Sequence, residues 1–386
     1  MKRVLAACGA LGALAGALTA SASTSTTVYE WGRPVAPGGP GQIPTIVHTV
    51  PDLVQIDAGN FADVLVRGHG KVWVWGTTQG ATSMSLLQVQ GASNVLQRPV
   101  DGNGDFAALK QPGSNPTCPG STTVITWGLS ESGDLGIGPA VNGTSYASAQ
   151  DVTTLDCQNV VQLAAANSHI VALTASGGVY VWGGNTNAAL GLGYTSKFID
   201  APVLNAAATA LTRGTSSGVQ VTAGVQDGGI LVNGHAYSWG DNTYGQCGCN
   251  STATDIVSPT AVDQGGVLFS WIDQGGNTGA DGHELALTAA GVVYAWGDGA
   301  EGQLGRGTTV DSDVPLPVPG LPVIVDVRAG GMHSLALDRD GNVWAWGSNN
   351  DGQVGNGSTG YVLTPVEVMS GVRMISAGSL HSLAAQ

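Results

Sequence analysis

The chain has 386 residues, of which 60 are glycine, and only 10% of its side chains are charged, against about 25% in an average soluble protein. Its net charge of -14 and scattered Lys and Arg exclude a protein that binds nucleic acid through phosphate contacts. An apolar content of 42% with 10 tryptophans excludes a disordered chain, and glycine without a three-residue period excludes collagen.

Residues 1–22 have the pattern of a secretory signal peptide. Lys2 and Arg3 precede an apolar run at residues 4–19, and Ala-Ser-Ala at residues 20–22 forms a cleavage site. The mature chain, residues 23–386, is therefore expected outside the cytoplasm, in the periplasm, at the cell surface or in the medium. Lipid attachment at Cys8 is the less favoured alternative. No membrane span is expected after cleavage, because no other segment is long and apolar enough.

The rest of the chain is repetitive. Seven Trp-Gly pairs occur at intervals of 44 to 57 residues, which fits a repeated unit of four short strands. The tryptophans of these pairs are Trp31, Trp75, Trp127, Trp182, Trp239, Trp296 and Trp346.

Each unit has the same internal order. In the last complete copy, Ala-Gly-Gly-Met-His at residues 329–333 precedes an apolar strand at residues 334–337. A turn at residues 338–342 leads to a second strand at residues 343–346, in which small apolar residues alternate with tryptophan. A glycine-rich loop, Gly-Gln-Val-Gly-Asn-Gly at residues 352–357, follows. This order predicts antiparallel strands joined by tight turns.

The two ends of the chain complement each other. The chain stops after a first strand, at Gln386, and the mature chain begins with a second strand that contains Trp31. Only a closed ring gains from joining such ends. The sequence therefore predicts an all-β, seven-bladed β-propeller that is closed by pairing of the N- and C-terminal strands in one blade.

These motifs resemble the regulator of chromosome condensation repeat family, whose unit reads Ala-Gly-x-x-His-Ser, Gly-x-Val-Tyr-x-Trp-Gly and Gly-Gln-Leu-Gly-x-Gly. The resemblance covers residues 27–386 and is strongest at residues 329–357. With the signal peptide it implies an exported, bacterial-type member and a single propeller at residues 23–386. The family name also implies guanine-nucleotide exchange, which an exported acidic protein does not favour.

Features that recur in most blades are interpreted as structural. The Trp-Gly tryptophans are expected to pack between blades. Four histidines begin buried strands beside a glycine turn, where a backbone hydrogen bond is expected and a shared metal site is not: His169, His283, His333 and His381. No metal and no cofactor is predicted.

Catalytic motifs fail on their context. Gly-Thr-Ser-Ser-Gly at residues 214–218 lacks the strand before and the helix after that a nucleophile elbow requires. His-Glu-Leu-Ala-Leu at residues 283–287 lacks the second zinc-binding histidine. The acidic segments at residues 101–105 and 338–342 are interpreted as turns and not as calcium loops.

Four cysteines remain after signal cleavage, an even number that indicates disulfides in an oxidising compartment. Of the three possible pairings, Cys118 with Cys157 and Cys247 with Cys249 is preferred.

Aromatic residues outside the repeated positions are candidates for binding. Most lie in or near the loops that follow the Gly-x-Gly turns, which open on the same end of a propeller, and one lies in the long segment at residues 263–282. A rim of aromatic side chains is typical of a protein-binding surface. The candidates are Tyr146, Tyr194, Phe198, Tyr244, Trp271 and Tyr361.

The sequence thus predicts an exported binding module without catalysis, a monomer that recognises a protein or cell-surface ligand through one propeller face. The alternative is an enzyme, a lyase or hydrolase, with its site at the central pore. Guanine-nucleotide exchange is the third hypothesis.

Overall fold

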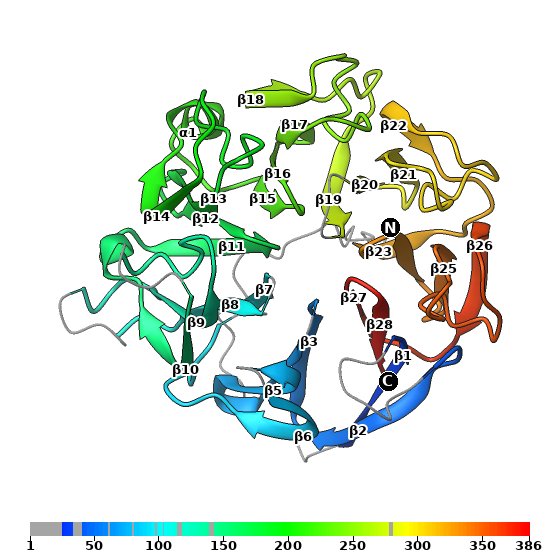
Figure 1. The fold of residues 1–386 in the computed structure, drawn as a ribbon, viewed down its shortest axis with the longest axis horizontal. Helices are drawn as coiled ribbons and strands as arrows, with labels where there is room; N and C mark the ends of the chain where they lie inside the picture. Colours follow the sequence, from blue (N-terminus) through cyan, green and yellow to red (C-terminus); the bar gives the residue numbers. More distant parts are fainter. Residues whose placement is uncertain are drawn as a thin grey trace, which may run out of the picture.

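The computed structural model describes residues 25–33, 41–60, 62–78, 81–96, 99–102, 104–113, 118–138, 143–277 and 281–386. Their strands form seven antiparallel sheets of four strands, arranged as blades around a central axis (Figure 1). The predicted seven-bladed propeller is confirmed. The predicted signal peptide at residues 1–22 lies outside the described residues, and in the described ranges no helix is long and apolar enough to cross a membrane.

We number the blades in chain order and give the strands of each from the axis outward. Blade 1 consists of β3 (Leu53–Ala58), β4 (Ala62–Arg67), β5 (Lys71–Thr78) and β6 (Ala81–Gln88). Blade 2 consists of β7 (Val100–Asp101), β8 (Asp105–Lys110), β9 (Thr123–Ser130) and β10 (Thr144–Asp151). Blade 3 consists of β11 (Val160–Ala166), β12 (His169–Thr174), β13 (Val179–Gly184) and β14 (Phe198–Leu204).

Blade 4 consists of β15 (Val219–Ala223), β16 (Asp227–Val232), β17 (His235–Asp241) and β18 (Asp255–Ala261). Blade 5 consists of β19 (Phe269–Gly276), β20 (Gly282–Thr288), β21 (Val293–Gly297) and β22 (Ser312–Pro317). Blade 6 consists of β23 (Ile324–Ala329), β24 (His333–Asp338), β25 (Val343–Gly347) and β26 (Val362–Met369). Blade 7 consists of β27 (Met374–Ala377), β28 (His381–Ala385), β1 (Ser25–Gly32) and β2 (Thr45–Pro51).

Blade 7 closes the ring as the chain ends predicted. The N-terminal strand β1 pairs antiparallel with the C-terminal strand β28, with Val28 opposite Ala385 and Trp31 opposite Ser382. Figure 1 shows these blue and red strands side by side. The closing blade therefore joins residues that are more than 350 positions apart in sequence, and its hydrogen bonds hold β28 and β1 together where the chain does not connect them.

Burial explains the composition of the strands. The second strand of a blade is covered by neighbouring blades on both faces, so that every residue of β24 is buried and its central Leu-Ala-Leu is apolar. The outer strand β26 faces solvent, and none of its residues is fully buried. Seven apolar clusters fill the spaces between adjacent blades.

The repeated tryptophans pack between blades, as predicted. Trp346 is fully buried, and its indole N–H donates to the carbonyl oxygen of Gln303, in the glycine-rich loop of the preceding blade, at 2.7 Å. Gly305 of that loop lies flat against the indole with φ of +66°, and a Cβ there would come within 2.7 Å of Trp346 Nε1. The loop needs glycine for both its backbone angle and its close approach. Trp182, Trp239 and Trp296 repeat this hydrogen bond.

Three short helices complete the described elements. The helix α1 (Ala206–Thr212) connects blades 3 and 4 and is capped by Asn205, whose side chain accepts from Ala208 N–H at 2.9 Å. Two 3₁₀ turns, η1 (Gly68–Gly70) and η2 (Thr153–Leu155), lie between strands. Residues 214–218 come after a helix and before a strand, the reverse of a nucleophile elbow.

Candidate functional site

A belt of buried polar residues runs along the junctions between blades, where the first residue of one second strand faces the second residue of the next. At the junction of blades 6 and 7, His333 Nε2 lies 2.9 Å from Ser382 Oγ, and that hydroxyl donates to the Gln353 carbonyl at 2.8 Å. Because the hydroxyl proton is used there, the imidazole must donate from Nε2. His283 and Ser334 repeat the pair between blades 5 and 6.

These histidines are structural, but their partners differ from the prediction. We expected backbone hydrogen bonds, whereas His283 and His333 bond to a serine side chain of the next blade. Burial lowers the pKa of each of these two imidazoles to about 3, so both are neutral at pH 7. Burial also lowers the pKa of His169 to about 4.

Two junctions replace the neutral pair with carboxyl groups. Between blades 4 and 5, Gln274 Nε2 donates to Asp227 Oδ2 at 2.9 Å and to Glu284 Oε1 at 3.0 Å, and all three side chains are buried. Burial, and then the neighbouring carboxyl, raise the pKa of Glu284 well above its usual range, and burial raises that of Asp227 to about 6. The pair therefore holds a proton near neutral pH.

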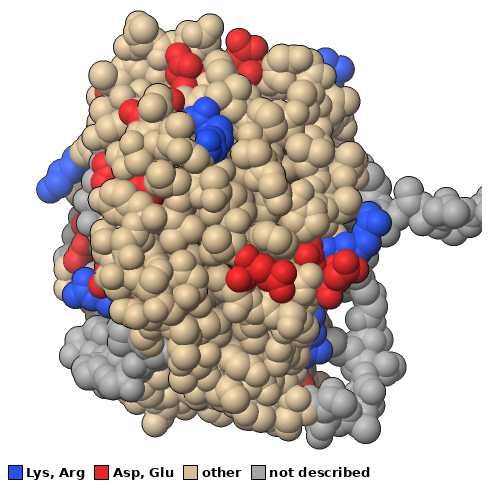
Figure 2. Space-filling model, turned by 90° about the vertical axis from the view of Figure 1, so that its right-hand side faces the viewer, with Lys and Arg blue, Asp and Glu red and all other residues tan. Residues whose placement is uncertain are grey.

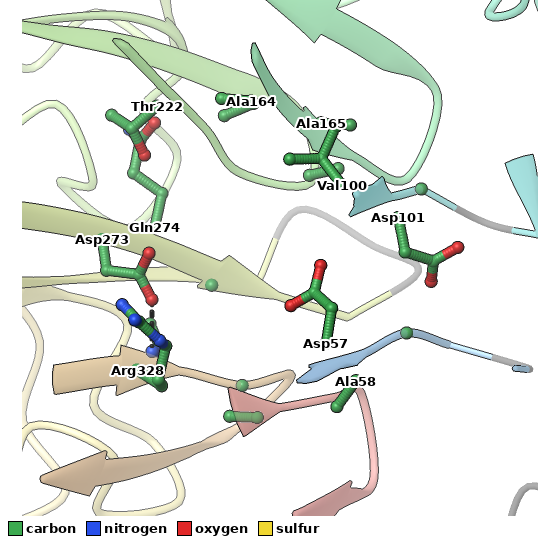
Figure 3. A pocket seen from close by; sticks show the side chains of 18 of the residues that line it. Asp57, Ala58, Val100, Asp101, Ala164, Ala165, Thr222, Asp273, Gln274 and Arg328 are labelled. Atoms are coloured by element: carbon green, nitrogen blue, oxygen red, sulfur yellow. Dashed lines mark hydrogen bonds between the residues drawn. The ribbon is translucent and has the colours of Figure 1, made fainter. Parts of the chain in front are cut away.

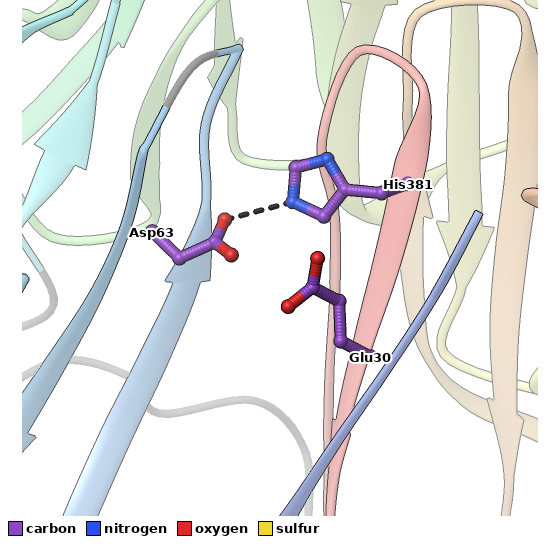
Figure 4. A group of neighbouring side chains, drawn as sticks. All are labelled: Glu30, Asp63 and His381. Carbon is purple, nitrogen blue, oxygen red and sulfur yellow. Dashed lines mark hydrogen bonds and ion pairs between the residues drawn. The ribbon is translucent and has the colours of Figure 1, made fainter. Parts of the chain in front are cut away.

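The second carboxyl junction closes the ring, between blades 7 and 1. His381 Nε2 lies 2.8 Å from Asp63 Oδ1, and Glu30 faces both groups (Figure 4). The three side chains are at most 1% exposed. Burial opposes the charged imidazole, but the charge and hydrogen bond of Asp63, together with the charge of Glu30, outweigh it, so the pKa of His381 is raised. Within the described ranges this is the one group of His, Cys, Asp and Glu side chains with metal-ligand spacing.

The central pore is a small cavity of about 160 Å³ lined by the innermost strands. Strand register gives each blade one equivalent pore position, whose occupants are Asp57, Val100, Ala164, Thr222, Asp273, Arg328 and Ser376. Figure 3 shows the result: Val100 of blade 2 and Ala164 of blade 3 are apolar, whereas Asp57, Asp273 and Arg328 are charged, and Asp101 of blade 2 adds a carboxyl group beside Val100.

Charged side chains of the pore wall interact with other groups of the protein. Arg328 donates to Asp326 at 3.0 Å and lies over the ring of Trp271 at 5.5 Å, and Asp273 accepts the backbone N–H of Ala329 at 2.9 Å. Asp101 is half-buried in the pore wall: burial, followed by the charges of Asp105 and other carboxylates, raises its pKa well above the usual range.

The aromatic candidates occupy two kinds of place. Tyr194, Tyr244 and Tyr361 lie in the connections between the third and fourth strands of blades 3, 4 and 6, and Tyr194 and Tyr361 are each 50% exposed. Tyr146 and Phe198 lie at or near the start of the fourth strands β10 and β14, half-buried. Because the strands run the same way in every blade, these positions share one end of the ring.

Trp271 stands apart from the other candidates. It lies on the innermost strand β19, lines the pore and is half-buried under Arg328. The ring also separates Tyr361 in blade 6 from the aromatic residues of blades 2 to 4 by one blade. The structure therefore brings part of the candidate set to one sector of the ring and not the whole set to one spot.

A hollow of about 360 Å³ lies beside Tyr194, on the seam between blades 3 and 4. We call it the rim groove; it is lined by Gly191, Leu192, Tyr194, Val203, Leu204, Asn205, Ala206, Ala207 and Ser258. Its lining contains no charged side chain, and Leu204 is 47% exposed. Val257, next to Ser258, is 40% exposed and accepts Gly193 N–H at 2.7 Å.

The cysteines lie in the preferred pairs. Cys118 and Cys157 have a Cα–Cα separation of 5.3 Å, and Cys247 and Cys249 one of 5.2 Å, both within the usual range for a disulfide. The first pair ties the segment before β9 to the segment before β11, across blades 2 and 3.

Sequence reasoning missed the carboxyl junctions. Asp63 and Glu284 occupy the position of Ser334 and Ser382, opposite the repeated tryptophan, and Glu30 occupies that of Ala345. Aligning the seven copies strand by strand would have shown a charged residue where the repeat has a small one. The acidic turns at residues 101–105 and 338–342 do connect strands: Asp338 Oδ1 accepts two backbone N–H groups of its own turn.

Comparison with known proteins agrees with this geometry. Mouse E3 ubiquitin-protein ligase HERC2 is 29% identical over 262 residues, which are 55% of this chain and 5% of that protein. Arabidopsis thaliana ultraviolet-B receptor UVR8 is 30% identical over 192 residues, 50% of this chain and 41% of that protein. The chain thus spans less than half the length of these relatives.

Two solved structures share the fold over nearly the whole chain. Prp20p from Saccharomyces cerevisiae superimposes with a TM-score of 0.75 at 17% identity, over 94% of this chain and 91% of that one. Human WBSCR16 gives 0.75 at 20% identity, over 94% and 99%. The RCC1-like domain model matches residues 123–386, more than half of the sequence. The chain therefore belongs to the RCC1-like domain family.

Proposed function

We propose that this protein is an exported protein-binding propeller without catalysis of its own, and that it docks its partner at the rim groove. The observation that carries the proposal is the uncharged groove between blades 3 and 4, bordered by the exposed side chains of Tyr194 and Leu204. Such a border offers an aromatic anchor and apolar area around a recess, which is the composition of a binding hot spot.

Two further observations support binding. The printed description of the Prp20p structure reports that protein's binding to Gsp1p and histones, so a propeller of this shape serves as a protein-binding scaffold. Several polar side chains are engaged in the molecule itself, since His283 and His333 link blades and Arg328 is held by Asp326 and Trp271. Figure 2 shows the edge of the ring at blades 5 and 6, away from the rim groove, where charged side chains are scattered among uncharged ones.

The site of action is part of the proposal. The N-terminal pattern at residues 1–22 supports export, and the two cysteine pairs suit an oxidising compartment. Mass spectrometry of the natural protein tests this directly: a mature N-terminus at Ser23 and a mass lower by four hydrogens than the reduced chain are expected.

The binding proposal is tested with a matched pair of variants. Tyr194→Ser and Tyr361→Ser each remove a tyrosine of equal exposure from the same connection in different blades. Chemical crosslinking and affinity capture from the cell envelope and medium should yield a stoichiometric partner. Its purified form should bind the Tyr194→Ser variant at least tenfold more weakly.

The Tyr361→Ser variant should bind the purified partner like the wild type. Equal binding by all three proteins would place the partner elsewhere and overturn the rim groove assignment. The lack of any stoichiometric partner in both fractions would overturn the binding function itself.

A further inference from the structure

We propose that Glu30, Asp63 and His381 form a binding site for one divalent transition-metal ion, of the Zn²⁺ or Mn²⁺ class, that staples the ring closed. We call these three residues the closure cluster. One ligand atom of each lies within 4.8 Å of the others, and each side chain is at most 1% exposed. Figure 4 shows the two carboxylates and the imidazole turned toward one another.

The closure cluster departs from the other histidine junctions in a specific way. Between blades 6 and 7 the histidine meets a serine hydroxyl, and the serine donates to a loop carbonyl. Between blades 7 and 1 the serine position holds Asp63. The carbonyl is replaced as well, because the Trp75 indole donates to Glu30 Oε2 at 3.4 Å, where other repeated tryptophans donate to a loop carbonyl. The closure cluster thus has two carboxylates where the junction of blades 6 and 7 has two neutral oxygen atoms.

That exchange places excess negative charge in a site without water contact. Two carboxylates and one imidazole carry a net negative charge in either ionisation state of the imidazole, and burying net charge is costly unless a counter-charge joins it. A neutral serine would satisfy the histidine equally well, as Ser382 and Ser334 do. The carboxylates therefore call for a cation or a proton.

An independent feature points to a cation. Asp63 Oδ2 is buried and has no hydrogen-bond partner among the described residues, although Oδ1 of the same group accepts from Gly59 N–H at 3.3 Å and meets His381. A bound metal ion would use this oxygen. Imidazole nitrogen with carboxylate oxygen is a donor set of Zn²⁺ and Mn²⁺ sites, and the chain offers no cysteine there.

The position of the closure cluster indicates that a bound ion would stabilise the closed ring. Glu30 comes from the N-terminal strand β1, His381 from the C-terminal strand β28, and Asp63 from β4 of the first blade. One ion would bind the three segments that must meet for the ring to close. Binding that requires the folded arrangement adds to the stability of the fold.

The experiment uses the full mature chain, freed of metal with a chelator and then titrated with Zn²⁺ and with Mn²⁺ separately. Metal content after gel filtration and the melting temperature are both recorded. Asp63→Asn and Glu30→Gln preserve size and hydrogen bonding but remove one charge each. Glu284→Gln is the matched control, because it removes a buried carboxylate from the same strand position of another blade.

We expect one equivalent of metal and a rise in melting temperature for the wild type and for Glu284→Gln. Asp63→Asn and Glu30→Gln, folded by circular dichroism, should bind at least tenfold more weakly and show no such rise. Wild-type protein that takes up no metal at millimolar concentration would overturn the proposal and leave a shared proton as the counter-charge. Equal uptake by all four proteins would place the ion outside the closure cluster and overturn it as well. If one variant fails to fold, the other decides.

Discussion

The junctions on the two sides of blade 7 use the same histidine position with different partners. His333 meets the hydroxyl of Ser382 on one side, and His381 meets the carboxylate of Asp63 on the other. The first pair is neutral, because burial keeps the pKa of His333 near 3; the second favours a charged imidazole, because the carboxylate raises the pKa of His381. The same fold element thus tolerates a neutral and an ionic link.

The difference follows from where the chain is continuous. Blades 6 and 7 are connected by the backbone between β26 and β27, whereas blade 7 itself is assembled from both chain ends. His333 and Ser382 are 49 residues apart in sequence, whereas His381 and Asp63 are 318 residues apart. The second link therefore holds together strands from opposite ends of the chain. We therefore attribute the stronger, charged link to the closure, and the following predictions test that comparison in order of expected effect.

Removing residues 23–33 should have the largest effect. The deletion takes away β1, its pairing with β28 and the fully buried Trp31, and leaves two open edges in the ring. Thermal unfolding should lose its cooperative transition, or its midpoint should fall by more than about 10 °C, since loss of the buried indole alone costs about 3–5 kcal/mol. A melting temperature equal to that of the intact chain would show that the clasp does not hold the ring.

Truncating the two histidines separates the ionic from the neutral junction. His381→Ala leaves the Asp63 carboxylate buried without its partner, which should cost about 3–5 kcal/mol of unfolding free energy. His333→Ala should cost about 1–3 kcal/mol, because Ser382 keeps its hydrogen bond to Gln353. Urea unfolding of metal-free protein at pH 7 measures both, and equal losses would contradict the contrast between the two links.

At the junction of blades 4 and 5 we expect the stability of the fold to fall as the pH rises. The folded-state pKa values of Asp227 and Glu284 are raised above their ordinary values, so their contribution to stability is full at low pH. It is lost as the pH rises from about 4 through about 6 and beyond. Glu284→Gln removes one titrating group, so the melting temperature of the variant relative to wild type should be higher at pH 7.5 than at pH 5. A difference that is the same at both pH values would show that the pair carries no extra proton.

The propeller was predictable because its signals are repeated. Each Trp-Gly pair indicates an indole packed between blades, and each glycine-rich loop indicates a backbone that passes close to such an indole. A single Trp-Gly pair would be an ambiguous motif, but seven of them identify a repeat. The closed ring was predictable for the same reason, because the two chain ends carry complementary parts of one repeat. Repetition also identified the histidines as structural, although their side-chain partners lie about 50 residues away and are not visible in a single repeat.

The site residues were harder to predict because they break the repeat. Glu30 and Asp63 look ordinary in sequence, and only the register of β1, β4 and β28 brings them to one histidine. Trp271 is of the residue type that often anchors binding surfaces, but it lies on the innermost strand β19 under Arg328. The rim groove depends on helix α1 and on two blades meeting, which no local motif encodes.

We expect the smallest change in stability from a substitution in the pore wall, where a partly exposed ion pair serves as the comparison for the buried junctions. Arg328 pairs with Asp326 where their side chains are 13% and 25% exposed, so solvent screens the charges. Arg328→Met keeps the contact of the stem with Trp271 and removes the guanidinium, which should change the unfolding free energy by at most about 1 kcal/mol. Because this pair is accessible to ions, raising the salt concentration should reduce the difference further, whereas the cost of His381→Ala should change little. An effect of Arg328→Met as large as that of His381→Ala would mean that burial is not what makes the closure junction strong.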